Sequence, residues 1–237
     1  MNGRDLTLGL VGALAVGAAL GRRGSRATEP TSTPAFRRWF GESKVVDGAG
    51  RPLVVYHGTD KDFDAFDLNA ASRGGHPSSA LGAFFSQEPH IAARFNRDLT
   101  AAKPFAKFHE LPFSDGAVTV PAILSIKNPK VLSAEDFREL MGVGWKEREL
   151  RTPDGDSRWG FLRSPEEWRA LRDQWASDGY DGVIVTRDLR AYFGSGHEEW
   201  MADTFVAFRP TQIKSATGNR GTFDPNDPRI SYNRGPR

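Results

Sequence analysis

The stretch "PLVVYHGTD", residues 52–60, places a histidine and a glycine directly after an apolar run of strand-forming residues. Valine and tyrosine favour β-structure, so Leu53–Tyr56 is predicted to be a strand. We expect His57 at the carboxyl end of that strand and a sharp turn at Gly58 that exposes backbone N–H groups. A lone histidine in such a place most often bonds a loop carbonyl, so its neighbours decide whether it faces a ligand.

Two aromatic features follow the histidine. "LGAFFS", residues 81–86, contains a second glycine-aromatic turn, and Phe95 follows Phe84 by eleven residues on a predicted helix. Paired phenylalanines taken by themselves usually belong to a core. The histidine, the glycine-aromatic turn and the eleven-residue spacing together form a more specific pattern than any one of them.

Helix and strand signals alternate along the chain beyond residue 33. Thr33 with Pro34 predicts the start of a short helix, and Ser164 with Glu167 forms the capping signature of a longer one. "DGVIV" and "TFVAF" predict strands in the second half of the chain. No internal repeat is present in the sequence. This order predicts an α+β domain of short strands separated by helices.

Composition narrows the classes of function. The chain has 237 residues, of which 38% are apolar and 26% charged, which fits one compact domain with appendages. It has no cysteine, which excludes disulfides, thiolate metal sites and thiol catalysis. The formal charge of +2 is small, so any polyanionic partner has to be argued from a site.

The amino-terminal segment has a different character from the rest. "LTLGLVGALAVGAAL", Leu6–Leu20, carries no charge, and arginines follow it. The run is shorter than a usual membrane span, and most of its positive charge follows the apolar stretch, whereas a signal peptide has it before that stretch. It therefore predicts either membrane association or a buried or oligomerising helix. We expect residues 1–33 to form this apolar segment with a flexible linker, and residues 34–237 to form the folded domain.

The ordered motifs resemble the ADP-ribosyltransferase fold of the diphtheria-toxin and poly(ADP-ribose)-polymerase class. That pattern has a strand ending in Tyr-His-Gly-Thr or His-Gly-Ser, then Gly-x-Tyr, then a second tyrosine eleven residues later. Residues 56–59 match the first part. Gly82, Phe84 and Phe95 match the rest by position, with phenylalanine in place of both tyrosines.

A closer similarity is to the ADP-ribosyltransferase-like domain of polyvalent proteins from phages and mobile elements. The segments that carry it are "FRRWFGESKVVDGAGRPLVVYHGT", "SIKNP", "GYDGVIV" and "FVAFRPTQIKSATGNRGTFDPNDPRISY". They cover about residues 36–232. This resemblance implies a split β-sheet core with short helices.

The same resemblance implies NAD as the substrate and no metal. His57 would then bond the adenosine ribose, the Gly58 backbone would hold the nicotinamide carboxamide, and aromatic walls would flank the cationic ring. The predicted NAD-binding residues are Tyr56, His57, Gly58, Thr59, Gly82, Phe84, Phe85, Ser86 and Phe95. The predicted nicotinamide sandwich consists of Phe84 and Phe95.

The third motif of the family departs from its pattern. Related enzymes usually have a glutamate at the start of the last strand, where this chain has Thr204 in "DTFVAF". Asp203 is our first candidate for the missing anion, followed by Gln212 and then Glu199. With His57, Asp203 and Gln212 form the predicted catalytic set.

The carboxyl-terminal "QIKSATGNRGTFDPNDPRISYNR" is rich in turn residues and predicts a segment that packs over a sheet edge. Its polar residues Lys214, Asn219 and Arg220 offer an alternative, because cations suit the NAD pyrophosphate. Arg73 is a comparable candidate.

Two classes of function follow from the sequence. The first is an NAD-dependent transferase that mono-ADP-ribosylates a host macromolecule, a protein rather than a nucleic acid, as a phage effector with NAD hydrolysis as a side reaction. It would act in the host cytoplasm, with residues 6–20 associating it with a membrane or a virion. The alternative is a degenerate, non-catalytic domain that binds NAD or a partner.

Overall fold

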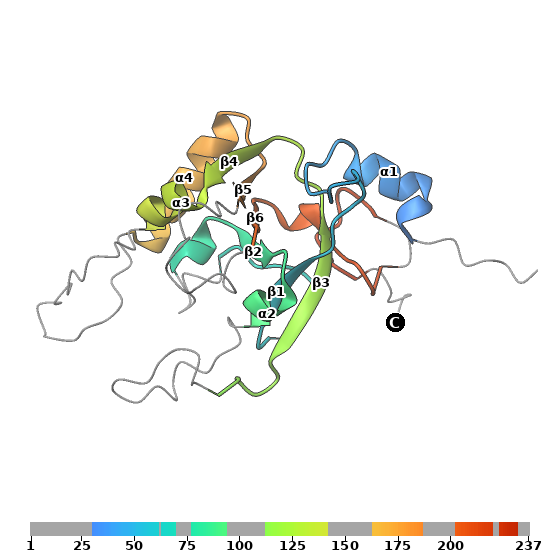
Figure 1. The fold of residues 1–237 in the computed structure, drawn as a ribbon, viewed down its shortest axis with the longest axis horizontal. Coiled ribbons are helices and arrows are strands. Elements are labelled where there is room, and N and C mark those ends of the chain that lie inside the picture. Colours follow the sequence, from blue (N-terminus) through green and yellow to red (C-terminus); the bar gives the residue numbers. More distant parts are fainter. Residues whose placement is uncertain are drawn as a thin grey trace, which may run out of the picture.

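The structure is a computed structural model that describes residues 30–61, 63–69, 77–93, 112–141, 163–186, 202–219 and 223–231. Within these ranges the chain forms a seven-stranded sheet flanked by short helices (Figure 1). The strands are β1 (Val55–Thr59), β2 (Ala83–Ser86), β3 (Val118–Leu124), β4 (Pro129–Ser133), β5 (Gly182–Thr186), β6 (Thr204–Ala207) and β7 (Ile213–Ser215). The helices are α1 (Pro34–Phe40), α2 (Pro89–Ala92), α3 (Ala134–Met141) and α4 (Pro165–Ser177), with short 3-10 turns η1 (Pro30–Ser32), η3 (Pro77–Ala80) and η9 (Pro210–Gln212). The predicted α+β class is confirmed.

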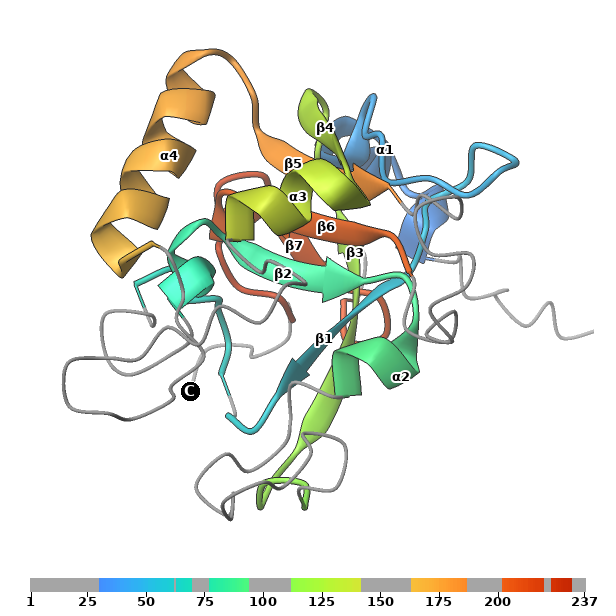
Figure 2. The same ribbon diagram turned by 60° about the vertical axis from the view of Figure 1, so that its left-hand side comes forward.

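The sheet is divided in its middle, as the family resemblance implied. Its strand order is β4-β5-β6-β2-β1-β3-β7, and only the β4–β5 pair is parallel. β1 pairs with β3 over five residues but meets β2 at the single pair Tyr56 and Ser86. Figure 2 shows β1 leaving the direction of β2 beyond this point. A junction with one bridging pair leaves backbone groups of both strands without ladder partners across the split.

The strand that contains the histidine runs further than the sequence indicated. We predicted that it ends at Tyr56 and that the chain turns at Gly58. In the structure β1 continues to Thr59, and Gly58 lies opposite Thr119 in the ladder with β3. The predicted turn at Gly58 is therefore wrong, because pairing with β3 extends the strand through a glycine that alone favours a turn.

Side chains alternate between two packed faces of the sheet. One face holds a central core that includes Val55, Phe85 and Phe205. The opposite face is covered by α4, whose Trp168 and Trp175 pack with alternate residues of β5 and β6. The predicted capping signature of α4 is confirmed, since Ser164 and Glu167 exchange side-chain and backbone hydrogen bonds.

A third cluster joins the two ends of the described domain. Thr33 caps α1 as predicted, and α1 presents Phe36 and Trp39 to the interior. Phe223, far away in sequence, packs its ring 4.9 Å from that of Phe36 and 5.4 Å from that of Trp39. The carboxyl-terminal segment thus lies against the amino-terminal helix.

The apolar run Leu6–Leu20 lies outside the described residues. Among the helices that the structure describes, none has the length and apolar character needed to cross a membrane. The boundary at residue 33 and the membrane or virion association stay predictions.

Candidate active site

His57 lies where β1 and β2 separate. Its Nδ1 is 2.7 Å from the backbone oxygen of Phe84, a residue 27 positions away in the chain. A carbonyl oxygen only accepts, so Nδ1 carries the proton and donates it. The imidazole therefore bonds to a β2 backbone group across the split.

The surroundings of the imidazole keep it neutral. Burial lowers the pKa of His57 below its ordinary value of 6.5, and the hydrogen bond to Phe84 opposes this only in part. In a neutral ring with the proton on Nδ1, Nε2 is a hydrogen-bond acceptor. The site thus offers a fixed acceptor of the kind that binds a hydroxyl group.

Three phenylalanine rings enclose His57. The ring centroid of Phe66 lies 4.8 Å from that of the histidine in an edge-on arrangement, with Phe85 at 5.5 Å and Phe63 at 6.4 Å. Phe63 and Phe66 come from the segment directly after β1. We did not predict either of them, although the pattern "FDAF" soon after the histidine was the available signal.

A second row of residues runs across the strands on the opposite face. Tyr56 pairs with Ser86, and Ser86 pairs with Thr204 at the start of β6. Because paired residues share a face of the sheet, these three lie side by side. Thr204, the residue at the position expected for a glutamate, is therefore next to Ser86, with Tyr56 one strand further along the row.

Phe84 lies on the same face as that row and is half-buried. Its ring packs 6.2 Å from that of Phe137 on α3. Its predicted partner in the nicotinamide sandwich, Phe95, lies outside the described residues. The sandwich stays a prediction.

Asp203 immediately precedes β6. Its backbone oxygen accepts a hydrogen bond of 3.0 Å from Gln87, which extends the ladder between β2 and β6 by one residue. Strand alternation therefore turns Asp203 to the face opposite Thr204. The two candidate positions for the anion belong to different faces of the same strand end.

Several predicted site residues have local structural tasks. The hydroxyl of Thr59 accepts from the Lys61 backbone, and that of Ser86 accepts from the Glu88 backbone just before α2. A Cβ atom on Gly82 would lie 2.5 Å from the backbone oxygen of Ala207. Gly82 is therefore required for the close approach of β6, whatever else it does.

Phe85 and Gln212, two of the predicted site residues, are buried. Phe85 is only 2% exposed and belongs to the central core, so it presents no surface to NAD. Gln212 is 4% exposed, and its amide nitrogen donates to the backbone oxygens of Ser125 and Asp181. Its amide oxygen accepts from the Arg209 backbone. These contacts favour a structural role for Gln212 over the predicted catalytic one, because this amide joins three backbone segments at the end of β6 away from Thr204.

The alternative proposed for the carboxyl-terminal cations is also corrected. Lys214 is 2% exposed, and its ammonium group donates to two backbone oxygens of residues 227 and 229. It is unsuited to a pyrophosphate, and the predicted packing segment is what the structure contains. Asn219 is buried as well. Arg73, Glu199 and Arg220 lie outside the described residues.

A family model described as "ADP-Ribosyltransferase in polyvalent proteins" matches residues 47–223. The chain belongs to this family. The match includes β1, the split and the start of β6, so the site lies within the ADP-ribosyltransferase domain. NAD is the substrate of the family and ADP-ribosyl transfer is its reaction. Searches among curated proteins and among solved structures found no significant match.

No group of three potential metal-ligating side chains occurs in the part of the ADP-ribosyltransferase domain that the structure describes. The expectation that the reaction uses no metal stays a prediction.

Proposed function

We propose that the protein transfers a single ADP-ribose unit from NAD to a host macromolecule, a protein rather than a nucleic acid, and hydrolyses NAD as a side reaction. The observation that carries the proposal is the neutral His57, held by the Phe84 carbonyl with Nε2 as an acceptor. A ribose hydroxyl is a donor of the matching kind.

The proposed reaction breaks the bond between the nicotinamide nitrogen and the ribose carbon. The electron pair of that bond leaves with nicotinamide, which becomes neutral, and positive charge develops on the ribose. A nucleophile on the acceptor then forms the new bond and loses its proton. Such a step depends on positioning and on preorganised charge more than on a strong base. His57 and the rings around it supply the positioning.

Asp203 is the proposed source of the negative charge. It lies one residue before Thr204, and its backbone is held by Gln87 at the end of β2. By alternation it belongs to the same face as Phe85 and Phe205. The carboxylate would stabilise the ribose as positive charge develops.

A hollow beside Phe66 is the proposed space for the adenosine end of NAD. Its volume is about 490 Å³, and it lies between the segment 66–69, α4 and the residues after β6. Phe66 both lines the hollow and contacts His57, which links this space to the proposed ribose site. Arg209 adds a cation to its wall.

A blocking variant tests this placement. Ala176 is an exposed residue of α4 that lines the hollow, so Ala176→Trp should fill the space and weaken NAD binding with little loss of stability. Ser177→Trp places the same ring on the neighbouring exposed residue and should leave NAD affinity unchanged. Equal NAD affinity of the two variants, measured by calorimetry, would show that adenosine does not bind in the hollow.

The second candidate function is a non-catalytic domain that binds NAD or a partner. Thr204 at the position of the usual glutamate favours it. The two candidates differ in turnover, and a domain that binds only a partner differs in NAD affinity as well.

The decisive experiment incubates the full chain with labelled NAD and a bacterial lysate. Labelled protein bands and free nicotinamide are expected from a transferase. Asp203→Ala should then lower turnover about 10²–10³-fold, as loss of one preorganised group does, with NAD affinity within a few-fold. Thr204→Glu should raise turnover in an attenuated enzyme. NAD binding without turnover in the wild type and in Thr204→Glu would establish the non-catalytic candidate.

The proposed setting is that of a phage effector in the host cytoplasm, associated with a membrane or a virion through residues 6–20. The full chain should float with lipid vesicles, and a variant in which Leu10 and Leu14 are changed to Asp should not. Identical flotation of the full chain and the variant would show that this segment does not bind membranes.

A further inference from the structure

Residues 223–231, here called the strap, connect β7 to the segment that follows β1. The backbone of Ser215 donates to the oxygen of Ile230, and the backbone of Ile230 donates to the oxygen of Asp64, both at 2.8 Å. Ala65 forms a β-bridge with Arg229. The strap therefore lies between β7 and the segment that follows β1 and is hydrogen-bonded to both.

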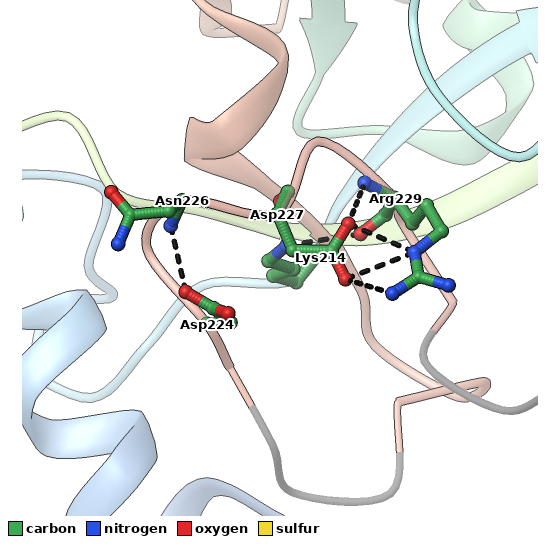
Figure 3. Close-up of polar contacts among 5 residues, drawn as sticks. All are labelled: Lys214, Asp224, Asn226, Asp227 and Arg229. Atoms are coloured by element: carbon green, nitrogen blue, oxygen red, sulfur yellow. Dashed lines mark hydrogen bonds and ion pairs between the residues drawn. The ribbon is translucent and has the colours of Figure 1, made fainter.

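Lys214 holds the strap through hydrogen bonds to its backbone (Figure 3). Its ammonium donates to the backbone oxygen of Asp227 and, at 2.9 Å, to that of Arg229. Burial lowers the pKa of Lys214, and the nearby charges of Asp227 and Asp224 oppose the shift. Lys214 is 2% exposed, and burying its charge is costly unless oxygens replace the water around the ammonium. Strap carbonyls therefore supply what this lysine requires.

A side-chain pair sets the shape of the strap at the place where Lys214 holds it. The carboxylate of Asp227 accepts from the backbone, Nε and Nη2 of Arg229, at 2.7 to 3.0 Å. These bonds lower the pKa of Asp227. Asp224 accepts from the backbone of Asn226 at 2.8 Å, which fixes the preceding turn. These side-chain bonds thus fix the backbone of the strap around the two carbonyls that face Lys214.

The strap is bonded to the chain segment that carries two of the rings around His57. Asp64 and Ala65, its backbone partners, are the two residues between Phe63 and Phe66. The rings of Phe63 and Phe66 lie 4.8 Å apart and both contact His57. The strap residue Ile230 is buried in the same central core as Phe66.

We infer that Lys214 is a positioning residue of the NAD site, which acts through the strap to hold Phe63 and Phe66 against His57. Its link to NAD rests on the proposed function, whereas its link to the histidine rests on the contacts alone. The carboxyl-terminal segment is thereby part of the site although none of its side chains need touch the substrate.

The experiment uses Lys214→Met in the full chain, which keeps the length of the side chain and removes its donors. Two quantities are measured: the pKa of the His57 ring by NMR without NAD, and the affinity for NAD. With the rings released, water reaches the imidazole, so its pKa should rise toward 6.5. NAD affinity should fall several-fold.

Phe36→Leu is the matched control. Phe36 is a buried residue of α1 that lies outside the strap, in a cluster that includes neither Phe63 nor Phe66. The control should lower the melting temperature and leave both readouts at their wild-type values. An equal shift of the His57 pKa in the control would show that any loss of stability raises this pKa, and that result would overturn the inference.

Arg229→Ala covers the case in which Lys214→Met does not fold. Its side chain is about half exposed, and its loss removes the side-chain bonds to the Asp227 carboxylate, which keeps only the bond from the backbone of residue 229. The backbone that Lys214 contacts is then held less firmly. The same rise in the pKa of His57 is expected, to a smaller extent. An unchanged pKa in either folded variant overturns the inference. A raised pKa together with a wild type that fails to bind NAD would instead refute the proposed function and leave the positioning role standing.

Discussion

Replacing Gln212 separates a structural role from a catalytic one. Its amide nitrogen donates to Ser125 at 3.0 Å and to Asp181 at 2.8 Å, and its amide oxygen accepts from the Arg209 backbone at 2.9 Å. These backbone segments follow β3, precede β5 and follow β6. Gln212→Ala should therefore leave three backbone groups without their partner in or near the core.

The expected loss of stability follows from those three bonds. At roughly 1 kcal/mol per hydrogen bond, Gln212→Ala should cost about 3 kcal/mol. For a domain of this size, roughly 2–4 °C per kcal/mol gives a fall in melting temperature of about 6–12 °C. Chemical denaturation measures the free energy of unfolding, and calorimetry with NAD measures affinity in the folded fraction. Affinity and turnover per folded molecule should match the wild type.

Gln212→Glu makes the test sharper. A carboxylate still accepts from Arg209, but it cannot donate to Ser125 or Asp181, and it buries a charge beside two carbonyl oxygens. The structural role therefore predicts that Glu is at least as destabilising as Ala. A role as the missing catalytic anion predicts the opposite, since glutamate is the usual residue of the family. Higher turnover in a stable Gln212→Glu variant would refute our reasoning.

Three further predictions concern stability. Burial lowers the pKa of His57 in the folded state below 6.5, so the unfolded chain takes up the proton first as the pH falls, and the free energy of unfolding decreases below about pH 6.5. His57→Gln should remove this part of the pH dependence, measured by urea titrations from about pH 7 to 5. Gly82→Ala brings a Cβ against the backbone oxygen of Ala207 and should cost about 1–3 kcal/mol, read as a lower denaturation midpoint. Ser164→Ala removes the cap that accepts from the Glu167 backbone and should cost about 1 kcal/mol in the same assay, while unchanged stability would deny the cap its role.

The sequence predicts best what neighbouring residues determine. The cap of α4 depends on residues three positions apart, Ser164 and Glu167, and it was predicted correctly. The end of β1 was predicted wrongly because the pairing of Gly58 with Thr119 bridges 61 residues, and no local signal reports it. A glycine in isolation favours a turn, but a complete ladder on one side overrides that preference.

The site was predicted through the family motifs and not through local chemistry. The bond from His57 to the Phe84 carbonyl exists only because the two strands separate after one bridging pair. The contacts of Gln212 were missed for a related reason, since two of its partners are 31 and 87 residues away. A polar residue in a loop sequence looks available for chemistry until the fold supplies backbone groups that need it.

The register of β6 decides how the missing glutamate is to be understood. Thr204 continues the row of Tyr56 and Ser86, so a carboxylate there would extend from the same face as those two residues. Asp203 is only one residue away but lies on the opposite face, the one that holds Phe85 beside His57. It is therefore no simple substitute for the family's glutamate. If Asp203 is catalytic, it must approach the ribose from the His57 side of the split, and Asp203→Ala and Thr204→Glu then act from two different sides. Activity lost in the first variant and not restored by adding the second would place the working anion on the histidine face.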